Sequence, residues 1–437
     1  MNYLPTGWLF VGRGPGSSSI SGSSRRRGLS DGLPRGLVSR GVGTPACRAR
    51  PFGLTRIDQG RNLKTTHMRS LFRQQLHRAV ILLFLTLPCL GQFRDPLPVP
   101  DIPGYRTLKC DFHMHTVFSD GEVWPTTRVN EAWREGLDAI SITDHAGYNP
   151  HDADVPPDLT RPFALATPLA ARLGIILVPG VEVMQRDTHF NILFVTDPNA
   201  FFKLSLAEAL RAAHARNGFI FWNHPGWKQL AAWFPDVAAL YDEKPFHGVE
   251  LVNGDTFYPP AFPWIEEKKL TILANTDVHA PTYPDYTDRK RPLTLVFART
   301  PDLDGIREAL FARRTAAWMG GELWGSEEHL RGLWQAAVSL ENSSLTFGPG
   351  STQIALRLQN RSAIRFVLGP PKTPAWLRAS EAELRPEAGV GMSLSITKQA
   401  PAGEQTVELE FEVTNLHTEP GRNLTVSLPL KINISKP

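Results

Sequence analysis

Histidine and carboxylate residues recur near the ends of the β-rich segments between residues 106 and 320. They stand in five short motifs, which are in chain order His113-x-His115-(x)3-Ser119-Asp120-Gly121, Thr143-Asp144-His145, Pro179-Gly180-Val181-Glu182, Asn223-His224-Pro225 and Asp277-x-His279. His189 opens a further β-rich segment. Imidazole and carboxylate groups are the side chains that bind divalent metal ions, so this recurrence predicts metal chemistry.

These donors are numerous enough for more than one ion. The candidate metal ligands are His113, His115, Asp120, His145, Glu182, His189, His224, Asp277 and His279. In an extended strand, residues i and i+2 point to the same side, so His113 with His115 and Asp277 with His279 can each serve one cavity. We therefore expect two or three divalent ions. A donor set without thiolates suits Zn, Mn or Fe and differs from a structural zinc site.

Each motif alone has an ordinary structural explanation. A lone His-x-His is usually a surface pair or a satisfied core pair, and Glu182 after Pro-Gly could be a loop acid. The order in which all the motifs occur favours one shared site.

The segments that carry the motifs alternate between strand and helix patterns. The expected strands are 108–111, 139–143, 175–178, 190–195, 219–223, 248–252, 271–275 and 293–298, and the expected helices include 126–135, 162–173, 205–216 and 302–311. Such alternation predicts an α/β fold with βαβ units and a parallel sheet or barrel. Polar residues at the carboxyl ends of barrel strands meet at one mouth, where the chemistry of such folds is done.

The rest of the chain divides into four further segments. Residues 1–67 are rich in Gly, Ser and Arg and are interpreted as a disordered extension or a mis-annotated start. Residues 68–91 combine a basic start with a short apolar run and predict a signal peptide, with the catalytic domain at 92–325. We expect a linker helix at 326–338 and a small antiparallel β-sandwich domain at 339–437, where alternating segments are separated by Gly, Pro and Asn turns.

The overall charge does not indicate a nucleic-acid scaffold. The formal net charge of the 437 residues is +4, but residues 1–67 alone hold 11 basic and 2 acidic residues. The predicted folded part is therefore net acidic. Three cysteines exclude a disulfide framework, and the composition excludes collagen-like and polytopic membrane proteins.

The five ordered motifs resemble those of the PHP (polymerase and histidinol phosphatase) superfamily over about 106–320. The longer strings 108–124 and 221–227, followed by a β-rich tail, resemble more narrowly the Sb-PDE family of haloalkylphosphate phosphodiesterases. The superfamily resemblance implies a distorted (β/α)7 barrel with metals at its C-terminal mouth.

The resemblance also implies how the ligands divide. A first ion would be bound by His113, His115 and Asp277, a second by Glu182, His189 and His224, and a third by Asp120, His145 and His279, with Glu182 bridging the first two. Asp144 would orient its neighbours. Glu182 and Asp277 would be the catalytic carboxylates, holding a metal-bridged hydroxide that attacks phosphorus, and Asp277 could take up a proton.

The sequence thus predicts an exported, periplasmic or secreted metal-dependent phosphoesterase, most simply a phosphodiesterase acting on small phosphate esters. A phosphomonoesterase of the histidinol-phosphatase type and a non-catalytic metal-binding module are the alternatives. Export argues against the first of these, and the complete ligand set argues against the second. No membrane span is expected in the mature form, and an oligomer remains open.

Candidate substrate-binding residues lie in the loops expected above the mouth. They are Tyr148, Lys228, Tyr283, Arg289 and Arg291, and the cationic ones could meet phosphate oxygens or belong to ordinary solvated surface. Trp222 and Trp227 could wall an ester group or pack in the barrel, which is the better interpretation for Trp222. The remaining histidines, at 151, 214, 247, 329 and 417, are expected to be structural.

Overall fold

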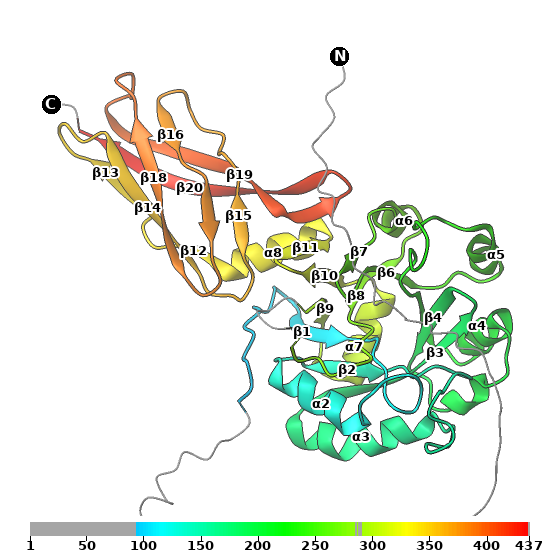
Figure 1. Cartoon of the computed structure of the whole chain (residues 1–437). Helices are drawn as coiled ribbons and strands as arrows, with labels where there is room; N and C mark the ends of the chain where they lie inside the picture. Colours follow the sequence, from blue (N-terminus) through cyan, green and yellow to red (C-terminus); the bar gives the residue numbers. More distant parts are fainter. Residues whose placement is uncertain (1–92, 285, 287–290, 436–437) are drawn as a thin grey trace, which may run out of the picture. The chain divides into compact units, whose positions relative to one another are not determined.

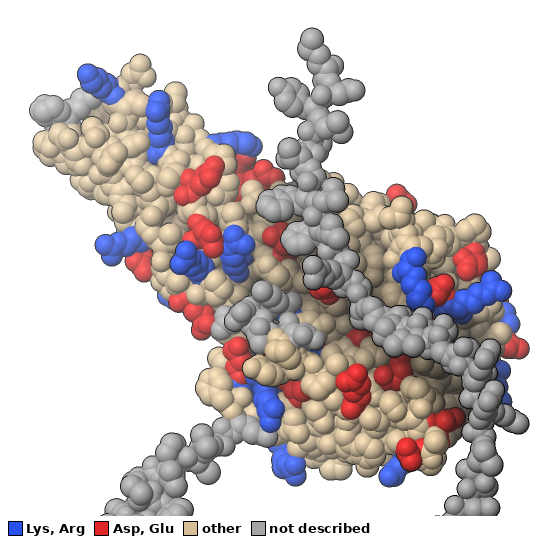
Figure 2. All heavy atoms as spheres, viewed as in Figure 1, with Lys and Arg blue, Asp and Glu red and all other residues tan. Residues whose placement is uncertain are grey.

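The computed structural model describes residues 93–284, 286 and 291–435 (Figure 1). The predicted extension 1–67 and signal peptide 68–91 lie outside these residues. Within them, no helix has the length and apolar character needed to cross a membrane. On the face shown in Figure 2, acidic and basic side chains are interspersed.

The first part of the described chain is a mixed α/β fold built on a large sheet, as the sequence predicts. Its strands are β1 (Arg106–Asp111), β2 (Ala139–Ile142), β3 (Ile176–Gln185), β4 (Thr188–Leu193), β5 (Phe219–Trp222), β6 (Gly248–Asn253), β7 (Thr256–Phe257), β8 (Thr271–Asn275), β9 (Leu293–Ala298), β10 (Thr315–Met319) and β11 (Glu322–Gly325). Two parallel sets are present, β1-β2-β3 and β5-β6-β8. Their carboxyl ends carry most of the predicted metal ligands.

The expectation of a parallel sheet or barrel is wrong where neighbouring strands are antiparallel, which among the predicted strands concerns β4 and β9. β4 is antiparallel to both β3 and β5, because the two residues Arg186 and Asp187 that follow β3 are too few for the crossover that a parallel pair needs. β9 is antiparallel to β1.

β3 is also longer than predicted, so that Glu182 lies inside a strand and not in a loop. Gly180 makes this possible, because a Cβ there would lie 2.4 Å from the Oγ of Ser141 in β2. The close approach brings Glu182 to the same edge as the ends of β1 and β2.

Threonine hydroxyls join the last parallel strand, β8, to β9 and β10. Thr294 Oγ1 accepts a hydrogen bond from Ala274 N and donates one to Ala274 O, each at 2.9 Å. Thr315 Oγ1 donates to Ile272 O at 2.7 Å. Because β9 pairs with β1, these bonds connect the two ends of the strand series.

Helices flank these strands, and two of them begin at capping residues. They are α2 (Pro125–Arg134), α3 (Thr160–Leu173), η1 (Pro198–Phe201), α4 (Leu206–Ala215), α5 (Pro235–Glu243), α6 (Ala261–Glu267) and α7 (Leu303–Phe311). Ser205 and Glu208 form a capping box at the start of α4, and Asp302 caps α7. The four predicted helices are found within two residues of their expected bounds, whereas α5 and α6 were not predicted.

The predicted linker helix is present as α8 (Glu327–Ala337), and only strands follow it (Figure 1). β12 (Val338–Leu340), β14 (Gln353–Asn360), β16 (Leu377–Ala379) and β18 (Gly389–Ile396) form one sheet, whereas β13 (Ser344–Phe347), β15 (Phe366–Leu368), β17 (Ala382–Leu384), β19 (Gly403–Glu419) and β20 (Arg422–Ile434) join the large sheet. β20 alternates buried and exposed residues, as a half-buried strand does. β11 pairs in parallel with β19, and β13 with β20, so the expected purely antiparallel pattern is not observed.

Candidate metal centre

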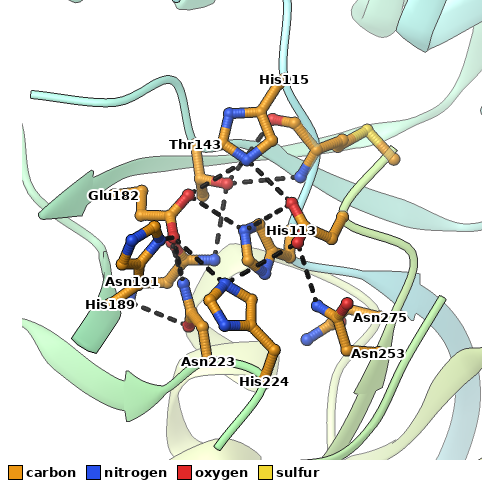
Figure 3. A network of polar contacts seen from close by, with 12 residues as sticks. His113, His115, Thr143, Glu182, His189, Asn191, Asn223, His224, Asn253 and Asn275 are labelled. Carbon is orange, nitrogen blue, oxygen red and sulfur yellow. Dashed lines mark hydrogen bonds and ion pairs between the residues drawn. The ribbon is translucent and has the colours of Figure 1, made fainter. Parts of the chain in front are cut away.

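All nine predicted metal ligands converge at one place on the first part of the fold. Figure 3 shows four of the six histidines, His113, His115, His189 and His224, gathered around Glu182. His113 Nε2 lies 3.1 Å from both Glu182 Oε2 and Asp277 Oδ1. His115 Nε2 lies 3.0 Å from the same two oxygens. The carboxyl ends of β1 and β8 and the middle of β3 supply these atoms.

The donors form three overlapping groups, each compact enough to hold one ion. The groups are His115, Asp120, His145 and His279; His113, His115, Glu182 and Asp277; and His145, Glu182 and His189. The division implied by the resemblance differs in detail, because His115 and His145 each belong to two groups. His224 stands beside them, with its Nε2 3.7 Å from Glu182 Oε1 and 3.8 Å from Asp277 Oδ2.

Four of the histidines have one ring nitrogen held by an oxygen, which leaves the other free to bind a metal. Glu250 Oε1 lies 2.9 Å from His113 Nδ1, and Ser119 Oγ lies 3.2 Å from His115 Nδ1. The carbonyl of Asp277 lies 2.7 Å from His279 Nδ1. Such partners fix the tautomer and the ring orientation of a metal ligand.

His189 follows the same rule with its nitrogens exchanged. Its Nε2 lies 3.1 Å from the carbonyl of Arg186, in the turn between β3 and β4. Its Nδ1 lies 2.9 Å from Glu182 Oε1. His189 therefore presents Nδ1 to the cluster, whereas His113, His115 and His279 present Nε2.

The donor set fits divalent metal ions on two counts. Metal–ligand bonds of about 2.0–2.2 Å place neighbouring ligand atoms about 3–3.6 Å apart, which is the spacing found around His113 and His115. In addition, the buried atoms His115 Nε2, Asp120 Oδ1 and His145 Nδ1 lie close to groups of opposite charge but form no well-aligned hydrogen bond with them. Buried polar atoms rarely lack a well-formed hydrogen bond, so a metal ion is a natural partner for these three.

The electrostatics of the centre point in the same direction. Burial alone would lower the pKa of His115, but the adjacent carboxylates of Asp277 and Glu182 raise it to about 10. Burial would raise the pKa of Glu182, but His145 and His113 hold it well below its usual range. Glu182 is therefore ionised at neutral pH, and divalent metal ions can take the place of the imidazole protons as its compensating positive charge.

Two of the donors stand on backbone that is unusual for their residue type. Asp277 has φ +54° and His224 has φ +28°. Non-glycine residues rarely adopt positive φ, and such strained positions cluster at functional sites. Each is the second residue after a parallel strand, and the backbone there turns its side chain back toward the centre.

Several residues that hold the ligands were not predicted from the sequence. Glu250 in β6 is fully buried and also accepts from the backbone N of His224 at 2.8 Å. Asn223 Nδ2 donates to Glu182 Oε1 at 2.8 Å. A signal for Glu250 was available, because it is a charged residue between the apolar residues 249 and 251 of a buried strand.

Asp144 is placed as an orienting residue, as predicted. Its carboxylate accepts from Thr116 N and Thr116 Oγ1, each at 2.6 Å, and from Ser119 Oγ at 2.7 Å. It belongs to none of the three donor groups among the described residues. Since Ser119 gives its proton to Asp144, its oxygen is free to accept the Nδ1 proton of His115.

The candidate substrate-binding residues differ in where they lie. Tyr148 packs against the imidazole of His145, with 6.0 Å between the ring centroids. Lys228 Nζ lies 3.6 Å from the centroid of Trp227, whose ring is 5.2 Å from that of His189. Both therefore stand beside the centre.

The other candidates are Tyr283, Arg289 and Arg291. Tyr283 is 80% exposed, and Arg289 lies outside the described residues. The prediction for Arg291 is wrong: its guanidinium is buried and paired with Asp111 at 2.5 Å and with Glu135, so it is not open to a phosphate. Two carboxylates that the sequence pattern did not connect to Arg291 hold it inside the fold.

The histidines expected to be structural lie outside the donor groups of the described residues, at positions 151, 214, 247, 329 and 417. His329 stacks on Phe297, and His417 stacks on Trp324. Trp222 is buried and stacks on Trp264, which confirms its interpretation as packing.

The fold and the centre together define a metal-binding α/β protein whose donors are suited to hydrolytic chemistry. A solved two-domain protein from Bacteroides vulgatus, which contains a predicted PHP-like metal-dependent phosphoesterase, is 38% identical to the chain. The similarity covers 78% of this chain and 100% of that one, with a TM-score of 0.72. The chain belongs to the PHP-like metal-dependent phosphoesterases.

Other comparisons are weaker. The uncharacterized protein MJ1295 of Methanocaldococcus jannaschii is 50% identical over 42 residues, which are 10% of this chain and 19% of that protein. The chain therefore matches about a fifth of the length of this curated relative. An amidohydrolase of Chromobacterium violaceum is 16% identical with a TM-score of 0.30, over 39% of this chain and 88% of that one. No model of a known protein family matches the chain.

Proposed function

We propose that this phosphoesterase is an exported phosphodiesterase that hydrolyses small phosphate esters, most like the Sb-PDE family. One observation supports the proposal above all others: eight imidazole and carboxylate donors from separate strands and loops meet in three overlapping groups, and the ninth, His224, lies beside them. Within the chain, the first group of strands would form a distorted (β/α)7 barrel and the last strands a sandwich domain. The partner that we propose is a small phosphate ester.

The three donor groups would hold two or three divalent ions, which we propose to be Zn, Mn or Fe. Bound divalent ions acidify water and neutralise phosphoryl oxygens. The group of His113, His115, Glu182 and Asp277 combines two imidazoles with two carboxylates. Glu182 also belongs to the group that contains His189, so it is the residue placed to be shared between two ions.

Two carboxylates are placed to handle the attacking water. Glu182 is completely buried and is held by the amide of Asn223, so it acts as a fixed acceptor. The side chain of Asp277 is 19% exposed, which opens it to the substrate side of the centre. We assign to Asp277 the orientation of the water and the uptake of its proton, and to Glu182 the holding of the ions.

The ester groups of the substrate would lie against the aromatic rings at the rim. Tyr148 is 46% exposed next to His145, and Trp227 is 39% exposed next to His189 and His224. The ammonium group of Lys228 lies over the ring of Trp227 and pairs with Asp187 at 3.2 Å. A phosphate oxygen that approaches Lys228 would compete with that carboxylate.

Two chromogenic substrates test this proposal. We expect the purified protein to hydrolyse bis(p-nitrophenyl) phosphate when Mn²⁺ or Zn²⁺ is added, and to lose this activity after chelation. Hydrolysis of p-nitrophenyl phosphate alone would support the phosphomonoesterase instead. Turnover of neither compound with either metal would contradict the proposal and favour the non-catalytic module.

A further inference from the structure

Arg128 is a fully buried arginine of helix α2 whose five N–H donors are all used. Nε donates to the carbonyl of His115 at 2.9 Å. Nη2 donates to the carbonyls of Val278 at 3.0 Å and His279 at 2.6 Å. Nη1 donates to Ala280 O at 2.9 Å and to Glu131 Oε2 at 2.8 Å. A buried charge is costly, so this complete pairing is needed to hold it.

The carbonyls that Arg128 binds lie just beyond the strands that carry metal ligands. The segments that follow β1 and β8 stay paired beyond these strands. They are joined by the bridge between Met114 and Val278 and by two hydrogen bonds, from His115 N to Val278 O and from Asp277 N to His113 O. Beyond these bonds the pairing of the two segments ends. Arg128 supplies donors to both of them where the pairing ends.

We propose that Arg128 is a positioning residue for the metal centre, which fixes the segment that contains His115 against the segment that contains Asp277 and His279. This inference rests on the proposed metal-dependent function. The two segments that Arg128 holds supply His115, Asp277 and His279, which belong to two of the three donor groups. The third group, of His145, Glu182 and His189, contains no residue from either segment.

A positioning role for Arg128 and a purely structural role predict different effects on metal binding. A purely structural residue would, when replaced, lower the stability and leave the metal affinity of the folded protein unchanged. A positioning residue would weaken the ions near His115 and leave the ion near His189 in place. Lysine keeps the charge but has three donors on one atom, so it cannot reproduce the planar five-donor contact.

The experiment titrates Zn²⁺ into chelator-treated full-length protein by calorimetry and measures the bound metal by elemental analysis. For Arg128→Lys, we expect the Kd of at least one ion to rise about 10–100-fold while another stays within about twofold of wild type. Arg134→Lys, on the exposed side of the same helix, is the matched control and should leave all sites unchanged. Unchanged affinities in Arg128→Lys, or an equal loss at every site, would overturn the proposal.

A second variant covers the case in which Arg128→Lys does not fold. Glu131→Gln keeps the guanidinium but removes its counter-charge, and should shift the same ions in the same direction by a smaller factor. An isotherm identical to that of wild type would overturn the proposal. A wild-type protein that binds Zn²⁺ but hydrolyses no phosphodiester contradicts the proposed function alone, whereas one that binds no metal contradicts both.

Discussion

The six histidines of the metal centre and the pair His214 and His247 place the same side chain in opposite surroundings. In the centre, His113 faces Glu182, Asp277 and Glu250. At the pair, His247 packs between Phe219 and Phe311, with ring centroids at 5.4 and 4.8 Å. Its Nδ1 accepts a hydrogen bond from Ile220 N at 3.0 Å.

The surroundings decide the charge and therefore the use of the imidazole. Burial would lower the pKa of His113, but Asp277, Glu182 and Glu250 raise it well above its usual value. Burial, helped by His214 and Arg307, lowers the pKa of His247 to about 4. A ring among carboxylates can exchange a proton for a metal ion, whereas a neutral ring among aromatic side chains serves packing.

The largest expected difference between the two regions is in catalysis. Replacing Asp277 by Asn should lower the turnover of bis(p-nitrophenyl) phosphate by about 10²–10⁴-fold, because the acceptor for the water proton is lost. The circular dichroism spectrum should stay that of the wild type. His247→Asn is the matched control from the other region and should keep near wild-type turnover. Equal turnover in Asp277→Asn and wild type would refute the assignment.

A smaller effect is expected from Glu250, which holds a ligand without joining a donor group of the described residues. Glu250→Gln should weaken metal binding by about 10–100-fold, because His113 loses the charged partner of its Nδ1. Zn²⁺ calorimetry measures this shift, and Glu267→Gln, on the exposed part of α6, is the control. If Glu250→Gln binds metal as tightly as wild type, the orienting role is wrong.

His247 itself should affect stability and not activity. His247→Leu removes the acceptor for the backbone N–H of Ile220, which should lower the free energy of unfolding by about 1–3 kcal/mol. Urea denaturation of the metal-loaded protein measures the change. A loss of turnover with unchanged stability would contradict the structural role of His247.

The smallest effect is a difference in the pH dependence of stability. The pKa of His247 is about 4 in the folded protein and near the ordinary 6.5 when unfolded, so the unfolded state takes up a proton first as the pH falls. Its stabilising contribution is complete above pH 6.5 and decreases between pH 6.5 and 4. Wild type should therefore lose more stability than His247→Leu over this window, and parallel curves would argue against a neutral His247.

The sequence predicted the centre better than it predicted what holds the centre. The donors stand in short local motifs, and each motif can be placed at a strand end from its own neighbourhood. Glu182 lies inside β3 because Gly180 allows close packing on Ser141, a contact between two strands that no local pattern shows.

Contacts between distant residues account for the remaining differences. Arg128 binds carbonyl groups about 150 positions away, and backbone acceptors leave no trace in side-chain patterns. Arg291 was expected at the mouth because it belongs to the loop after the seventh expected strand, but Asp111 and Glu135 hold it in the interior. Similarly, only the shortness of the turn at Arg186 and Asp187 reveals that β4 is antiparallel.

Determination of the metals in a crystal of the purified protein tests the central claim most directly. Anomalous scattering should reveal two or three peaks, each within about 2.0–2.3 Å of imidazole nitrogens and carboxylate oxygens of the nine donors. Strong density for a metal elsewhere, with these donors bound only to one another or to water in metal-supplemented crystals, would contradict the account.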